Sequence, residues 1–197
     1  MAHWGLTDPH VVAHDFGGAV TLRTHLFEGA SYASLMLVDV VAIPPSGSPF
    51  FQFVQAYPDL LDRLPGYVHR AVVRAYISNA SEKGLRDDVL DALAEPWTGD
   101  VGQPAFYRQI ADYDEKFLHD NASRASSMSI PVHIVWGEQD GWIPTDLAHR
   151  LHRLIPGATL TVVPSSGHLM HYDEPVALMH ELRSWLDARV LDQSRHP

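Results

Sequence analysis

Four short apolar runs recur along the chain, and three of them lead into a segment whose apolar residues have helical spacing. The runs span residues 10–14, 34–38, 132–136 and 159–163, and the helical segments span residues 19–27, 145–155 and 174–190. Continuous apolar runs that alternate with helices are typical of a parallel sheet covered by helices on both faces. The sequence therefore predicts an α/β fold with a parallel sheet of about four strands.

Between the second and third runs the pattern changes. Aromatic residues cluster at 49–53, and helical spacing returns at 70–79 and 87–94, separated by prolines and glycines. The alternating unit is thus interrupted once, by a segment with the character of a helical insertion. We expect an α/β core formed by residues 1–43 and 130–197, with residues 44–129 as a helical cap.

Composition and charge exclude several classes of function. The 197 residues carry 14 Lys and Arg against 24 Asp and Glu, a formal net charge of -10, which leaves no basic surface for nucleic acid. No apolar run reaches the roughly 18 residues of a membrane span, and the first residues lack the features of a signal peptide. We expect a cytoplasmic protein that binds neither membrane nor nucleic acid. The absence of cysteine excludes thiol nucleophiles and disulfides.

A tight turn with the sequence AHDFGG, residues 13–18, separates the first run from the helical segment after it. Small residues around Asp15 allow a strained turn that presents its carboxylate at the end of the strand, the geometry of a nucleophile elbow. Aspartate is also a favoured helix N-cap. This segment alone therefore leaves two interpretations open, a nucleophile or a capping residue.

Further polar residues follow the later strands. Asp140 lies after the third run and His168 after the fourth, and each alone is typical of a capping acid or a surface histidine. Open α/β sheets gather ligands at the carboxyl ends of their strands, and the chain order Asp15, Asp140, His168 is that of nucleophile, acid and histidine.

These segments resemble the α/β-hydrolase superfamily, in particular its branch with aspartate nucleophiles, which contains haloalkane dehalogenases, fluoroacetate dehalogenases and epoxide hydrolases. The similar motifs are HDFGG at 14–18, WGEQDGWIP at 136–144 and the segment from Gly167-His168 to Glu174-Pro175, within a resemblance that runs from Pro9 to Leu191. The resemblance implies Asp15 as nucleophile, His168 as base and Asp140 as the partner of His168. Asp39, at the end of the second run, lies where some haloalkane dehalogenases have their acid, so it is an alternative to Asp140, although only Asp140 lies on a full motif. We expect no cofactor.

An aspartate nucleophile suits one kind of substrate. Attack on an ester would give a reactive anhydride, whereas attack on a carbon that bears a halide or an epoxide oxygen gives a stable alkyl ester. His168 can then activate water to hydrolyse that ester. We expect a hydrolase of epoxide or carbon-halogen bonds in small hydrophobic organic substrates.

Two residues bear on the leaving group. Phe16 follows the nucleophile where haloalkane dehalogenases usually carry tryptophan and fluoroacetate dehalogenases arginine, and it has no side-chain donor. Tyr107, in Phe106-Tyr107-Arg108, resembles the tyrosine of a Tyr-Arg pair that polarises the oxygen in epoxide hydrolases, although it could instead pack in the cap. We take Phe16 and Tyr107 as substrate-binding candidates and expect epoxides to be preferred over chloroalkanes.

Two expectations concern what the chain lacks. The pairs His168 and His171, and His149 and His152, have metal-like spacing but no third ligand, so we expect no metal site. The resemblance implies about four strands before the elbow, including a loop with an oxyanion donor, which residues 1–9 do not provide. We therefore expect the C-terminal part of the fold, with an exposed sheet edge, possible self-association and impaired hydrolysis. The alternative is an inactive remnant or an interaction protein.

Overall fold

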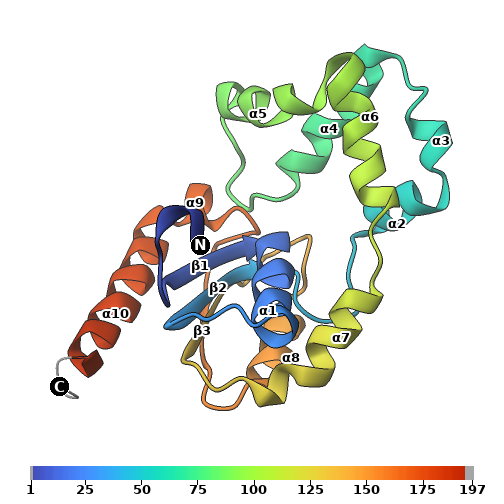
Figure 1. Cartoon of the computed structure of the whole chain (residues 1–197). Coiled ribbons are helices and arrows are strands. Elements are labelled where there is room, and N and C mark those ends of the chain that lie inside the picture. Colours follow the sequence, from blue (N-terminus) through green and yellow to red (C-terminus); the bar gives the residue numbers. More distant parts are fainter. Residues whose placement is uncertain (1, 194–197) are drawn as a thin grey trace.

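The computed structural model of the chain describes residues 2–193 (Figure 1). In this part of the chain, four strands form one parallel sheet in the order β1 (His10–Asp15), β2 (Ser34–Val40), β3 (Val132–Gly137) and β4 (Thr159–Val163). The register aligns Leu37 of β2 with Ala13 of β1 and with Ile134 of β3. The predicted α/β fold and its four strands are confirmed.

Helices cover both faces of the sheet, namely α1 (Phe16–Glu28), α7 (Lys116–Arg124), α8 (Asp146–Leu154) and α10 (Pro175–Gln193). Successive residues of a strand point to opposite faces. Leu35 and Leu37 of β2 join the apolar cluster that includes residues of α1, α7 and α8, whereas Met36 and Val38 join the cluster that includes Trp185 of α10. Burial on both faces explains why β2 is one continuous apolar run.

A second group of helices lies beyond the carboxyl ends of the strands (Figure 1). These helices are called the cap here: α2 (Pro49–Ala56), α3 (Pro58–Leu61), α4 (Gly66–Ser78), α5 (Asp87–Ala94) and α6 (Gly99–Ala111). The cap has its own apolar cluster, which includes Phe51, Val73 and Phe106. Ser48 caps α2, because its hydroxyl accepts a hydrogen bond from the backbone N–H of Phe51 at 3.2 Å. The remaining short elements are α9 (Met170–Asp173) and the 3-10 turns η1 (Ala2–Trp4), η2 (Glu95–Trp97) and η3 (Ala125–Ser127).

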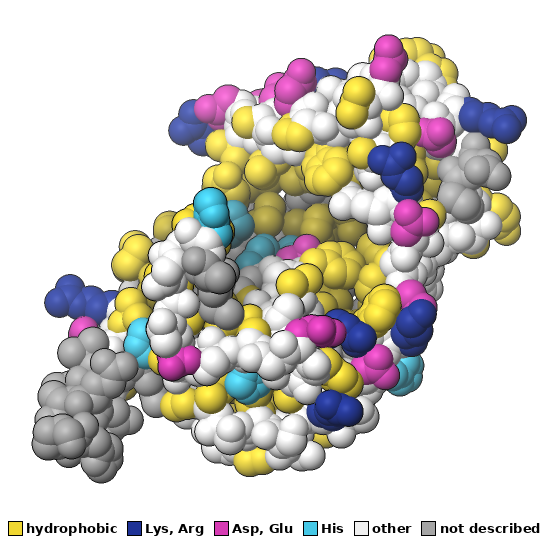
Figure 2. Space-filling model, in the orientation of Figure 1, with side chains coloured by type: hydrophobic (Ala, Val, Ile, Leu, Met, Phe, Trp, Pro, Cys, Tyr) yellow, Lys and Arg dark blue, Asp and Glu magenta, His cyan; other side chains and the backbone are white. Residues whose placement is uncertain are grey.

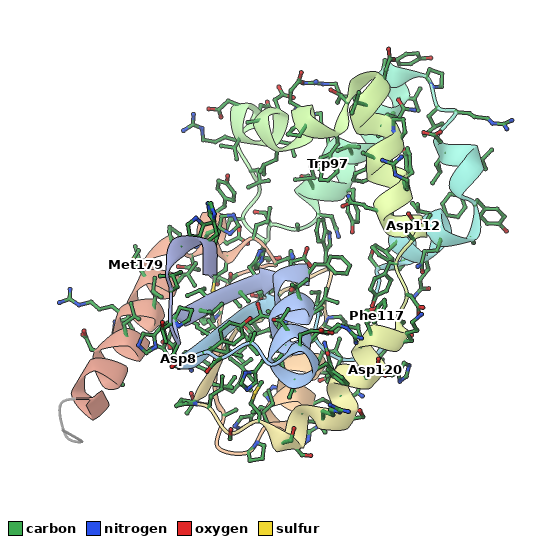
Figure 3. The ribbon with its side chains drawn as sticks, viewed as in Figure 1. Asp8, Trp97, Asp112, Phe117, Asp120 and Met179 are labelled. Carbon is green, nitrogen blue, oxygen red and sulfur yellow. The ribbon has the colours of Figure 1, made fainter. Side chains whose placement is uncertain are left out.

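Residues 44–129 pack in two different places: helices α2 to α6 pack on one another in the cap, and α7 packs on the α/β core. The partner of α7 is α1, where Arg23 forms an ion pair with Asp120 at 3.2 Å and lies over the ring of Phe117. Both α7 residues are labelled in Figure 3. Leu118 of α7 accordingly belongs to the cluster of the α/β core rather than to that of the cap. The cap proper therefore ends with α6 and the turn after it.

The first strand lies at an edge of the sheet. Among the described residues β1 pairs with β2 alone, and Val12 at its centre is 50% exposed. An apolar strand edge of this kind can pair with another chain. None of the helices in residues 2–193 is long and apolar enough to cross a membrane.

Candidate active site

The turn between β1 and α1 places Asp15 in a strained conformation. Its backbone angles, φ of 51° and ψ of -128°, lie in a region that residues with a Cβ rarely adopt. Helix α1 begins at the next residue, Phe16. A Cβ on Gly18 would come within 2.3 Å of the Val40 side chain, so glycine is required for α1 to lie this close to β2. Asp15 makes no side-chain capping bond to α1, which favours the elbow over the capping interpretation.

His168 brings the three predicted residues together. Its Nδ1 lies 2.9 Å from Asp140 Oδ2, and its Nε2 lies 3.6 Å from Asp15 Oδ1. The side chains of His168 and Asp140 are buried, whereas that of Asp15 is 34% exposed. Because a carboxylate only accepts hydrogen bonds, Nδ1 of neutral His168 carries the proton and Nε2 presents its lone pair toward Asp15.

Asp140 is oriented by the loop that follows β3. Its Oδ1 accepts hydrogen bonds from the backbone N–H groups of Trp142 and Ile143, each at 2.8 Å. These two bonds occupy one carboxylate oxygen and leave Oδ2 for His168. The carboxylate is therefore arranged to hold the imidazole in one orientation and to stabilise its positive charge.

Burial and charge set the protonation of this cluster. Burial disfavours charged His168, but the hydrogen bond to Asp140 and the charges of Asp140 and Asp15 outweigh it and raise the pKa of His168 above its ordinary value. Burial raises the pKa of Asp15, and the nearby His168 partly offsets this. Burial and the nearby His168 lower the pKa of His14 to about 4, so His14 is neutral at pH 7, where its Nε2–H donates to the His168 carbonyl at 2.9 Å.

Asp39, the alternative acid, has a different environment. It is fully buried at the end of β2, where its Oδ1 accepts a hydrogen bond from the Gly137 N–H at 2.7 Å. Its Oδ2 has no hydrogen-bond partner among the described residues. Burial, together with the charge of Asp140, raises the pKa of Asp39 well above its usual range. The hydrogen bond from His168 goes to Asp140 and not to Asp39.

A cavity of about 550 Å³ lies between the core and the cap, with Asp15 in its wall. Figure 2 shows the molecule hollowed there, with hydrophobic side chains around the hollow and histidine and acidic side chains at its base. Trp97 and Asp112, labelled in Figure 3, belong to the cap side. The residues that line the cavity are mostly aromatic and aliphatic: Asp15, Phe16, Phe51, Tyr76, Ile77, Leu93, Trp97, Phe106, Gln109, Ile110, Asp112, Tyr113, Trp142 and Leu169.

The structure places Phe16 in this cavity but not Tyr107. Tyr107 is 1% exposed, and its hydroxyl lies 2.9 Å from His69 Nδ1. Because His69 Nε2–H donates to the Trp97 carbonyl, Nδ1 is left to accept a hydrogen bond from the Tyr107 hydroxyl. The hydroxyl of Tyr107 is thus used within the cap, which contradicts its predicted role in substrate binding.

Two other tyrosines line the cavity. Tyr76 stacks on Trp142 with ring centroids 4.3 Å apart, and the hydroxyl of Tyr113 lies 2.5 Å from Ser46 Oγ. Tyr113 could have been found from the sequence, since it continues the helical spacing of Phe106, Gln109 and Ile110, which also line the cavity. The sequence carries no comparable signal for Tyr76.

No group of three His, Cys, Asp or Glu side chains within residues 2–193 is arranged to hold a metal ion. His168 and His171, which have metal-like spacing, both pack near His14, with ring centroids 4.7 Å and 5.7 Å from it. Their arrangement is one of packing and hydrogen bonding.

Comparison with known proteins agrees with this geometry. Residues 2–181 match the model of the alpha/beta hydrolase family. The chain belongs to the alpha/beta hydrolase family. A crystal structure of an alpha/beta hydrolase fold protein from Burkholderia ambifaria is 42% identical with a TM-score of 0.89, and the match covers 92% of this chain and 67% of that one.

More distant relatives of this alpha/beta hydrolase show how wide the family is. An uncharacterized protein of Mycobacterium tuberculosis, Rv2715, is 28% identical over 99 residues, which are 50% of this chain and 29% of that protein. The haloalkane dehalogenase DbeA from Bradyrhizobium elkani is 12% identical with a TM-score of 0.79, covering 97% of this chain and 71% of its own. At this identity the likeness shows the fold alone. The chain thus spans less than a third of the mycobacterial relative and about two thirds of the solved structures.

Proposed function

We propose that this alpha/beta hydrolase cleaves epoxide or carbon-halogen bonds through an ester formed on Asp15. The observation that carries the proposal is the carboxylate at the elbow, with His168 Nε2 at 3.6 Å and Asp140 behind the imidazole. Esterases and a lipase are also among the relatives of this fold. The carboxylate argues against ester hydrolysis, because its attack on an ester carbonyl would give an anhydride.

In the first step, an oxygen of Asp15 attacks the substrate carbon and forms a carbon-oxygen bond. The electron pair of the broken bond leaves with the halide or with the epoxide oxygen. An epoxide oxygen requires a proton at this point, and Tyr76 is the candidate donor, because it lines the same cavity as Asp15. Burial raises the pKa of Tyr76 to about 12, so the hydroxyl stays protonated until the epoxide ring opens and the leaving oxygen accepts its proton.

In the second step, water attacks the carbonyl carbon of the Asp15 ester. His168 Nε2 accepts the proton of that water, and Asp140 stabilises the imidazolium. Collapse of the intermediate releases the alcohol and restores the Asp15 carboxylate. The proton on His168 then neutralises the tyrosinate left by an epoxide, or departs to solvent when a halide has left.

The cavity supports a neutral, hydrophobic substrate. Its lining contains seven aromatic side chains, and the charged residues among those that line it are Asp15 and Asp112, with no Lys or Arg. A substrate carboxylate would be repelled by both acids and would find no cation to pair with. Small uncharged epoxides that bear an aromatic ring fit these walls, because aromatic pairs contribute beyond their buried area.

The test is to trap the ester on Asp15. A His168→Gln variant incubated with styrene oxide or a 1-haloalkane should gain the mass of the substrate-derived group on the peptide that contains Asp15, since the second step has lost its base. In the same His168→Gln background, Asp15→Asn should show no adduct, and Asp112→Asn, at the cap side of the cavity, should still be labelled. Turnover by the parent protein without any adduct at Asp15, or hydrolysis of p-nitrophenyl acetate that survives Asp15→Asn, would contradict the proposal.

A second candidate function, association through β1, is favoured by the edge of that strand that has no partner strand within residues 2–193, and by the 50% exposure of Val12. In this case the protein binds another copy of itself or another polypeptide by strand pairing. Val12→Lys places a charge on the edge and should reduce the mass measured by light scattering, whereas Val176→Lys, exposed on α10, should not. A monomeric parent protein would count against this candidate.

A further inference from the structure

Asp173, at the end of α9, is a buried carboxylate outside the cluster of Asp15, Asp140 and His168. It is 4% exposed, yet its two oxygens accept four hydrogen bonds. The donors are the hydroxyl of Ser81 and the backbone N–H groups of Glu82, Lys83 and Gly167. Burial alone would raise the pKa of Asp173, but these bonds outweigh it and lower that pKa, so the carboxylate is ionised.

The donors to Asp173 belong to two parts of the molecule. Three of them lie in the cap turn between α4 and α5, and the fourth is the residue directly before His168. One oxygen, Oδ2, accepts from both sides, from Glu82 N at 2.9 Å and from Gly167 N at 2.7 Å. The cap turn and the His168 loop therefore both donate hydrogen bonds to one atom, Oδ2 of Asp173.

Direct contacts reinforce this connection. The Leu169 N–H donates to the Ala80 carbonyl at 2.9 Å, on the other side of His168 from Gly167. A Cβ on Gly167 would lie 2.8 Å from the same carbonyl, so the turn lies against the loop with no space between them. Of the residues on either side of His168, Leu169 is thus bonded to the cap turn directly and Gly167 is linked to it through Asp173.

We propose that Asp173 is a positioning residue that holds His168 in register with Asp15 by docking the cap turn 80–83 onto the His168 loop. The effect on catalysis rests on the proposed function, whereas the coupling of cap and loop does not. His168 acts in the second step alone, so a loosened loop should slow ester hydrolysis and leave ester formation nearly unchanged. A misplacement of about 1 Å can cost about 10²-fold in rate.

The chain offers a graded set of variants. Asp173→Asn replaces one accepting oxygen by an NH₂ group that faces N–H donors, and Ser81→Ala removes one donor while keeping the charge of Asp173. Asp173→Glu keeps the charge on a longer side chain and should partly restore function relative to Asp173→Asn. Lys83→Ala is the matched control, since it removes the exposed ion pair with Glu174 and leaves the backbone N–H of residue 83 in place.

Amide hydrogen exchange tests the coupling without any substrate. The informative amide is that of Leu169, which bonds to Ala80 and not to Asp173. Its exchange should become at least about fivefold faster in Asp173→Asn, less so in Ser81→Ala, and should be unchanged in Lys83→Ala. In parallel, single-turnover measurements should show ester hydrolysis slowed about 10- to 100-fold in Asp173→Asn, with ester formation changed by less than about threefold.

Three results would overturn the inference. Unchanged Leu169 exchange in both Asp173→Asn and Ser81→Ala would show that the turn is not coupled to the loop. Equal slowing of both half-reactions would show a general structural role instead of positioning. Equal effects of Lys83→Ala and Ser81→Ala would assign the connection to the surface ion pair. If Asp173→Asn fails to fold, Ser81→Ala decides, and if the parent protein forms no ester, the proposed function fails while the exchange result still decides the coupling.

Discussion

The α/β core and the cap contribute to the site by different means. In the core, Asp15 ends β1, and Asp140 and His168 lie in the loops after β3 and β4, so the parallel sheet brings the three residues to the carboxyl ends of its strands. Backbone N–H groups orient Asp140, which in turn holds His168. In the cap, the cavity walls come from helices, and which side chain faces the cavity depends on how those helices pack. In the core, the positions of the three polar residues therefore follow from the order of the strands. In the cap, the lining of the cavity follows from how the helices pack.

The sharpest test within the core compares its two buried acids. Asp140→Asn should lower the rate of ester hydrolysis about 10²- to 10⁴-fold, because the amide cannot stabilise the imidazolium that forms on His168. Asp39→Asn should change it less than about tenfold, since an asparagine oxygen can still accept the Gly137 N–H. Stopped-flow single-turnover assays measure both. A larger loss from Asp39→Asn would assign the supporting acid to the end of β2.

The corresponding test in the cap compares two tyrosines. Tyr76→Phe should slow epoxide opening about 10- to 100-fold by removing a hydrogen bond to a developing alkoxide, and should leave 1-haloalkanes unaffected. Tyr107→Phe should keep the rate but lower the free energy of unfolding by about 1 kcal/mol, because His69 loses a buried partner. Urea denaturation and initial rates separate these effects. An equal kinetic effect of the two substitutions would remove the distinction between cavity and cap interior.

A smaller effect follows from the pH dependence of the core. His168 must be neutral to accept a proton from water, and its pKa is raised above the ordinary value of 6.5. Ester hydrolysis should therefore be fully active above that raised pKa and fall about tenfold per pH unit below it. Ester formation, which needs ionised Asp15, should persist to lower pH. Coincident pH profiles for the two half-reactions would show that one group limits both.

The same contrast explains what the sequence could predict. The strands that lead to Asp15, Asp140 and His168 can be recognised in the sequence, because each is a short apolar run followed by a turn. The predicted role of Tyr107 in substrate binding is wrong, because its hydroxyl donates a hydrogen bond to His69, thirty-eight residues away in the sequence. That pairing depends on how the cap helices pack. The sequence carries no signal for Asp173 for a similar reason, since three of its four hydrogen-bond donors lie in the cap.

The position of the cap within the chain has an evolutionary consequence. β2 and β3 are neighbours in the sheet, and the whole cap lies between them in the sequence. The entropy of closing a loop rises only with the logarithm of its length, by about 0.6 kcal/mol per doubling. A core of this topology can therefore accept longer, shorter or entirely different insertions between these strands at little thermodynamic cost, so new substrate preferences can be acquired by exchange of one segment while the reacting residues stay in place.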